Sequence, residues 1–196
     1  MERRIHPIEA ESFAILRSRI DLGHLPPLSR AVAERVIHSS ADLDYAADLA
    51  IDDTAVKEAA QRLAEGAPIV TDVAMVASGI TSRDCVCHIA DPRADRLART
   101  AGITRSAAAV RTAHAEVGPG AVWVVGCAPT ALAEIIARRV EPALVVGLPV
   151  GFVGAAESKA ELRASGLPQV SNVSEKGGSA VAAAAVNALL YGPVPD

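Results

Sequence analysis

The sequence predicts a three-layer α/β/α fold, in which helices cover both faces of a mainly parallel β-sheet. Short apolar runs alternate with helical stretches over the later two-thirds of the chain, a pattern typical of right-handed parallel crossovers. Of the 196 residues, 51% are hydrophobic but only 3% are aromatic. This composition favours a doubly covered sheet packed with Ala, Val, Ile and Leu. We expect one domain over residues 1–196, because the chain is short for two.

Helices are expected before the alternation begins. Pro7 can occupy the first turn of one helix, and apolar residues at helical spacing follow it. Ser29 can cap a second helix after a Pro-Pro break, and a third ends at Gly66. These helices are expected over residues 7–20, 29–37 and 53–66.

The alternating part of the chain begins at residue 68. We expect a five-stranded parallel sheet of flavodoxin-like order, with the N-terminal helices as additions to it. The expected strands are residues 68–71, 85–90, 121–126, 143–148 and 168–173. The expected helices among them are residues 93–101, 105–116, 130–139, 158–165 and 179–190.

Turns rich in Gly or Pro follow three of the expected strands. Ligands of open parallel sheets bind beyond the carboxyl ends of the strands, where such turns would expose backbone N–H groups. Short turns also need Gly and Pro for structural reasons alone. Because three of them share one rim, a binding surface is at least as well supported as a purely structural role. The turns are residues 126–130, 149–154 and 175–179.

Charge and composition argue against several classes of protein. The formal net charge is −4 with both signs interspersed, which disfavours a nucleic-acid surface. The three cysteines form no evident disulfide framework, and the five histidines show no metal-ligand spacing. Residues 1–7 lack the apolar stretch of a secretory signal, and the apolar run 180–190 is too short to span a membrane. We therefore expect a cytoplasmic protein without a metal site.

Short segments in a fixed order carry a more specific signal. The longest is GLPVGFVGAAESK at residues 147–159. The others are residues 6–9, 12–13, 35–38, 67–72, 75–76, 79–81, 104–109, 128–132, 176–179 and 187–189. Each is weakly specific alone, but the ordered set resembles the precorrin-8X and cobalt-precorrin-8 methylmutase family across nearly the whole chain.

The resemblance implies a cofactor-free isomerase of cobalamin biosynthesis. Such an enzyme moves a methyl group from C-11 to C-12 of precorrin-8X, giving hydrogenobyrinic acid, or of cobalt-precorrin-8, giving cobyrinic acid. It also implies a homodimer that binds the substrate near the subunit interface. Any cobalt would arrive inside the substrate, and the sequence does not choose between the two substrates.

His38 is the expected catalytic residue, acting as a proton donor. The methyl shift involves no redox change, so a group that gives and recovers a proton near neutral pH would assist it. From spacing alone, a solvated histidine favoured by the helix dipole is the simpler interpretation. The resemblance favours catalysis, because His38 occupies the position of the family's catalytic histidine.

The expected substrate contacts are mostly polar. The guanidinium of Arg105 can hold a substrate carboxylate in bidentate fashion, and Ser12 and Thr81 match family positions that contact substrate. Lys159 and Lys176 could add carboxylate contacts, although a solvated lysine is the default. The predicted substrate-binding residues are Ser12, Thr81, Arg105, Gly151 and Lys176.

Two departures from the family pattern leave alternatives open. Cys127 replaces a family asparagine, and a cysteine between a strand end and a helix could be the nucleophile of a different enzyme. The segment Ser174-Glu175-Lys176 loses a family arginine and gains a carboxylate, which would weaken contact with a polyanion. This second change gives some weight to a non-catalytic tetrapyrrole-binding protein of the same fold.

Overall fold

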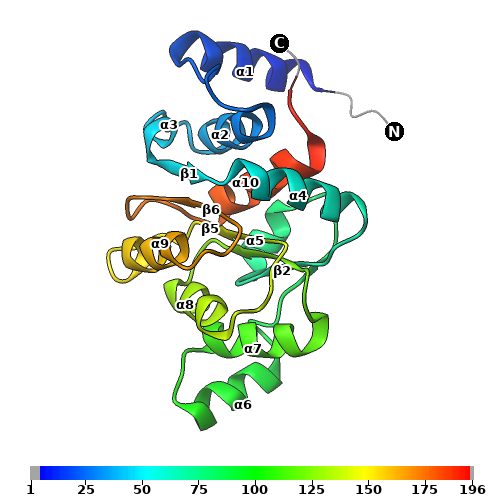
Figure 1. Ribbon diagram of the computed structural model, residues 1–196, viewed down its shortest axis with the longest axis vertical. Helices are drawn as coiled ribbons and strands as arrows, with labels where there is room; N and C mark the ends of the chain where they lie inside the picture. The colour runs from blue at the N-terminus through cyan, green and yellow to red at the C-terminus, as the bar shows by residue number, and fades with distance from the viewer. Residues whose placement is uncertain (1–4, 195–196) are drawn as a thin grey trace.

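A six-stranded sheet runs through the middle of the molecule with helices on both faces (Figure 1). The computed structural model describes residues 5–194. The strand order is β1-β6-β5-β4-β2-β3. The strands are β1 Leu49–Ile51, β2 Ile69–Thr71, β3 Cys85–Val86, β4 Val122–Val125, β5 Leu144–Gly147 and β6 Gln169–Asn172.

Strands β2 to β6 pair in parallel, whereas β1 runs antiparallel to its neighbour β6. The predicted α/β class is confirmed, and each of the five expected strands is present. The expected count was one too low, because the three residues of β1 lie between two helices, before the alternating part of the chain begins. The expected strand 85–90 was too long, since β3 ends at Val86 and a turn then closes between His88 and Asp91.

The eight expected helices are present in the described part of the chain, together with two that were not predicted. The additional helices, α3 and α5, have four and six residues and are too short to show a helical pattern. Ser29 does not cap α2, which begins at Pro27, and its hydroxyl donates instead to Asp53. The helices are α1 Pro7–Arg19, α2 Pro27–Ser40, α3 Tyr45–Asp48, α4 Asp53–Ala64, α5 Ala74–Gly79, α6 Pro92–Ala101, α7 Arg105–Val117, α8 Pro129–Arg138, α9 Ala155–Ala164 and α10 Ser179–Tyr191.

The side chains of the sheet alternate between two cores. Val122 and Val124 of β4 face a core that includes α2, α4 and α10. Trp123 and Val125 face the opposite core, built with α7, α8 and α9. Within the first core α2 packs on α10, and α1 packs on α2. Helices α1 and α2 therefore lie at one end of the molecule and α6 and α7 at the other (Figure 1).

Candidate active site

His38 lies in the last turn of α2, half-buried against α1. Its Nδ1 is 2.8 Å from the hydroxyl oxygen of Ser12. Its ring stacks on Phe13, with centroids 4.9 Å apart and an interplanar angle of 22°. No hydrogen bond reaches Nε2 from residues 5–194. Since His38 also lines a pocket of about 110 Å³ with Ile15 and Leu43, the ring is held at one nitrogen and one face and borders open space.

Two charged residues flank the His38 imidazole. Burial lowers the pKa of His38, the Arg35 guanidinium lowers it further, and the Glu9 carboxylate raises it. Arg35 and Glu9 pair with each other at 3.3 Å. In the free protein, His38 is therefore protonated less readily than a free imidazole in water.

Arg35 and Glu9 are not among the site residues predicted from the sequence. The available signal was their spacing, because residues three apart share one face of a helix. Arg35 stands three residues before His38, and Glu9 stands three before Ser12.

Thr81 joins this group through Tyr191 at the end of α10. The Thr81 hydroxyl oxygen lies 2.8 Å from the Tyr191 hydroxyl oxygen. The Arg35 guanidinium lies 5.3 Å from the centroid of the Tyr191 ring. The structure thus connects Ser12, His38 and Thr81 through one set of side-chain contacts, and the sequence alone carried no signal for Tyr191.

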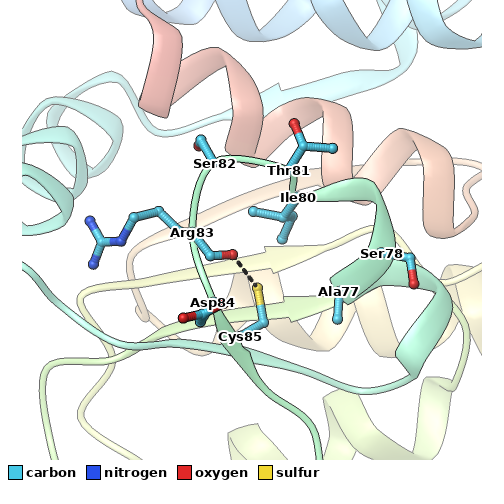
Figure 2. A pocket seen from close by; sticks show the side chains of 8 residues that line it. All are labelled: Ala77, Ser78, Ile80, Thr81, Ser82, Arg83, Asp84 and Cys85. Carbon is cyan, nitrogen blue, oxygen red and sulfur yellow. Dashed lines mark hydrogen bonds between the residues drawn. The ribbon is translucent and has the colours of Figure 1, made fainter. Parts of the chain in front are cut away.

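An open pocket of about 730 Å³ lies beside Thr81, along the segment that links α5 to β3 (Figure 2). Ser78, Ser82 and Asp84 contribute polar groups to its lining. The Arg83 side chain extends away from the other labelled side chains in Figure 2 and donates to the backbone carbonyls of Leu63 and Ala67 at 2.8 and 3.3 Å. Arg83 therefore ties this segment to the end of α4.

Asp72, directly after β2, organises the first of the three strand-end turns. Its carboxylate accepts backbone N–H groups of Gly126, Cys127 and Ala128 at 3.1, 2.9 and 2.8 Å. Burial raises the pKa of Asp72, and the three N–H donors act in the opposite direction. The expectation that these N–H groups face a ligand is wrong, because they bind an internal carboxylate.

The Cys127 side chain is exposed to solvent. Within the part of the chain that the structure describes, no side-chain hydrogen bond joins its sulfur to a histidine or a carboxylate, so the structure shows no base paired with this thiol. Cys85 and Cys87 are also free thiols.

Lys159 is fully buried, so the expectation of a solvated lysine is wrong. Its ammonium donates to the Asn172 side-chain oxygen at 2.8 Å and to the carbonyls of Ser174 and Lys176 at 2.5 and 2.7 Å. Burial lowers the pKa of Lys159 to about 8. Lys159 therefore fixes the segment after β6.

The ammonium of Lys176 lies between two carboxylates, 2.8 Å from Asp42 and 2.7 Å from Asp44. Their hydrogen bonds and charges raise the pKa of Lys176. These pairs bring the strand-end loops to the segment that follows His38. On the same rim, the N–H of Gly151 donates to the Glu175 carbonyl at 3.2 Å.

Arg105 is the first residue of α7 and is exposed. No ion pair or hydrogen bond engages its side chain among residues 5–194. The adjacent Thr104 caps α7, and its hydroxyl oxygen lies 2.8 Å from the hydroxyl oxygen of Thr130 at the start of α8. Because α7 and α2 pack on opposite faces of the sheet, one chain does not bring Arg105 and His38 together.

Residues 5–194 contain neither a metal-binding cluster nor a helix that could span a membrane. No three His, Cys, Asp or Glu side chains are grouped so that they could hold a metal ion. No helix in this range is both long enough and apolar enough to cross a membrane. His88 lies between two carboxylates, with Nδ1 3.1 Å from an Asp91 oxygen and Nε2 3.0 Å from a Glu116 oxygen.

Together the fold and the site define an α/β protein with a histidine-centred cluster beside the strand-end loops. A family model described as precorrin-8X methylmutase matches residues 7–192. The chain belongs to the precorrin-8X methylmutase family, as the ordered sequence segments indicated. Methylmutases move a methyl group within one molecule, and the chain is accordingly an isomerase.

Known relatives cover nearly the whole chain. The chain is 45% identical over 196 residues to the cobalt-precorrin-8 methylmutase of Salmonella typhimurium, covering 94% of this chain and 93% of the relative. It is 41% identical to the precorrin-8X methylmutase of Pseudomonas aeruginosa, covering 93% of each. A crystal structure of precorrin-8X methylmutase from Thermus thermophilus matches with a TM-score of 0.85 at 35% identity, covering 93% of each chain.

Proposed function

We propose that the protein moves the C-11 methyl group of precorrin-8X, or of cobalt-precorrin-8, to C-12 in cobalamin biosynthesis, with His38 as the proton donor. The product is hydrogenobyrinic acid or cobyrinic acid. The observation that carries the proposal is the bond from Ser12 to Nδ1 of His38, which leaves Nε2 for the substrate.

Ser12 suits both protonation states of His38. With a charged ring, the hydroxyl accepts from Nδ1–H, and it still does so after the ring has given its Nε2 proton; in the other neutral tautomer, the hydroxyl donates to Nδ1. As the methyl group leaves C-11 and bonds to C-12, a proton from Nε2 draws electron density from the conjugated system. A proton returns to His38 when the conjugation re-forms, so the reaction is a net isomerisation.

The charge of the substrate supports this role. The acetate and propionate carboxylates of a corrin precursor would place negative charge beside His38, which favours the imidazolium. Burial and Arg35 lower the pKa of the ring in the free protein, and bound carboxylates would raise it in the complex. The proton becomes available when there is a substrate to receive it.

We also propose a homodimer in which each substrate contacts both protomers. Two features support it. Arg105, the proposed carboxylate anchor, lies on the opposite side of the sheet from His38, and a second copy would supply it. Large apolar side chains are exposed, above all Phe152 and Val153 with exposed fractions of 96% and 89%.

Four further residues remain proposed substrate contacts: Ser12, Thr81, Gly151 and Lys176. The ion pairs of Lys176 with Asp42 and Asp44 would have to open before its ammonium could bind a substrate carboxylate.

We also propose a sheet type, a domain organisation and a cellular location for the molecule as a whole. The parallel strands are of flavodoxin-like type, which the order β3-β2-β4-β5-β6 supports. The chain is one domain, which a family match over residues 7–192 supports. The protein is cytoplasmic, which its three free thiols support.

Incubation with precorrin-8X and, separately, with cobalt-precorrin-8 tests the reaction. Conversion changes the chromophore and hence the visible spectrum, whereas a protein that only binds a tetrapyrrole leaves the substrate unconverted. Conversion of either substrate supports the proposal, and recovery of both unchanged would refute it. The variant Cys127→Asn should retain turnover, since its loss would indicate a cysteine-dependent enzyme instead.

A further inference from the structure

The candidate site is built where α1 and α2 meet through matched residues. One face of α1 carries Glu9, Ser12 and Phe13, at spacings of three and four residues. The facing side of α2 carries Arg35 and His38, three residues apart. Glu9 pairs with Arg35, Ser12 bonds to His38, and Phe13 contacts both partners on α2.

Arg35 is a buried cation in a fixed position, with only 8% of its surface exposed. Its guanidinium lies 5.5 Å from the Phe13 ring centroid and 5.3 Å from the Tyr191 ring centroid. Aromatic rings attract cations through their faces, and the Glu9 carboxylate adds an ion pair at 3.3 Å. Contacts from α1 and α10 together hold this charge on the side of α2 that carries His38.

We infer that Arg35 and Glu9 are positioning residues that set how readily His38 holds its proton. The inference deepens the proposed function and rests on it, because it concerns the same histidine. The fixed positive charge of Arg35 disfavours a second positive charge on the ring, and the carboxylate of Glu9 favours it. The directions in which these groups move the pKa of His38 agree with this geometry.

The other charged groups around His38 are mostly balanced by partners. Arg17 of α1 pairs with Glu34 at 2.9 Å, and Asp42, after α2, pairs with Lys176 at 2.8 Å. Arg19 of α1 lines the pocket beside His38. From α10, Tyr191 approaches through its contacts with Arg35 and Thr81.

The direct test is an NMR titration of the His38 ring in the full chain without substrate, with the resonance assigned by His38→Gln. Glu9→Gln removes the negative charge and should lower the titration midpoint. Arg35→Met removes the positive charge and should raise it, whereas Arg35→Lys keeps the charge and should stay nearer the wild type. Glu11→Gln, an exposed carboxylate on the same helix, is the matched control and should leave the midpoint unchanged.

A Glu9→Gln midpoint equal to that of Glu11→Gln would overturn the inference, as would an Arg35→Met midpoint that is not raised. If Arg35→Met does not fold, the comparison of the two glutamate variants decides alone. The alkaline limb of kcat/KM should move in the same direction as the midpoint for each variant. If the wild type fails to convert either corrin precursor, the proposed function fails, while the titration still reports whether Arg35 and Glu9 act on His38.

Discussion

His38 depends on four side chains for its orientation and charge. Ser12 and Phe13 hold the ring by one nitrogen and one face, and Arg35 and Glu9 provide fixed charges beside it. Three of these four come from α1, so docking of α1 on α2 completes the environment of the proton donor. Each of the four side chains can be removed by a single substitution, so such variants test the mechanism.

Ser12→Ala separates a positioning role from a substrate contact. Loss of the bond to Nδ1 should lower kcat about tenfold, equivalent to about 1.4 kcal/mol, with little change in KM. Steady-state kinetics with precorrin-8X measures both parameters. A raised KM with an unchanged kcat would instead show that Ser12 acts mainly as a substrate contact.

The pH dependence of turnover follows from the charges around His38. A proton donor acts only when protonated, so the rate falls as pH rises through its pKa. Burial and Arg35 lower that pKa in the free protein, so kcat/KM should decline at lower pH than for a solvated histidine. Bound carboxylates raise it, so the decline in kcat should lie at higher pH. The reverse order of the two limbs would contradict the assigned role.

At the carboxyl ends of the strands, buried side chains bind the turns that follow neighbouring strands. Asp72 after β2 binds three N–H groups of the turn after β4, and Lys159 of α9 binds the segment after β6. At Gly177 an added Cβ would lie 2.3 Å from the Leu148 carbonyl oxygen, so these two loops pack backbone against backbone. The rim of the sheet is thus held rigid by internal contacts.

Asp72→Asn tests this anchoring. A side-chain amide presents one acceptor oxygen and cannot satisfy three N–H groups, so the free energy of unfolding should fall by about 1–3 kcal/mol. Denaturant unfolding with an unchanged m-value measures the loss. The exposed carboxyl of Asp84 offers the control Asp84→Asn, and equal stability of the two variants would show that the Asp72 contacts contribute nothing.

Prediction from sequence succeeded where an element carries its own pattern. The long helices and the buried parallel strands do so, whereas α3 and α5 are too short to show a helical pattern and β1 lies between two helices. The family resemblance indicated His38 and Ser12. The roles of Asp72 and Tyr191 depend on contacts between distant segments, such as the bond from Tyr191 to Thr81 across 110 residues. No local spacing encodes contacts of that kind.

At the scale of the whole molecule, the sheet separates the proposed proton donor from the proposed carboxylate anchor. His38 belongs to the layer of α1 and α2, and Arg105 opens α7 on the far face (Figure 1). A site that uses both residues requires two protomers. The exposed Phe152 and Val153 offer apolar surface for such an assembly.

Mixed dimers test this sharing of residues. His38→Ala and Arg105→Ala should each have little activity alone, but a heterodimer of the two would contain one intact site. Random mixing at equal concentrations should therefore restore about a quarter of wild-type activity. Differently tagged chains, co-expressed and purified on both tags, verify that mixing occurred. Mixed dimers without recovered activity would show that His38 and Arg105 do not serve one shared site.

Conversion of precorrin-8X and of cobalt-precorrin-8 by wild-type and His38→Ala protein, followed in the visible spectrum, tests the central claim most directly. We expect the wild type to form the product of at least one of them, hydrogenobyrinic acid or cobyrinic acid. We expect the His38→Ala variant to fold and bind that product tightly while its turnover falls at least a hundredfold, the low end of a general-acid contribution of about 10²–10⁴. Wild-type turnover in His38→Ala would contradict the account.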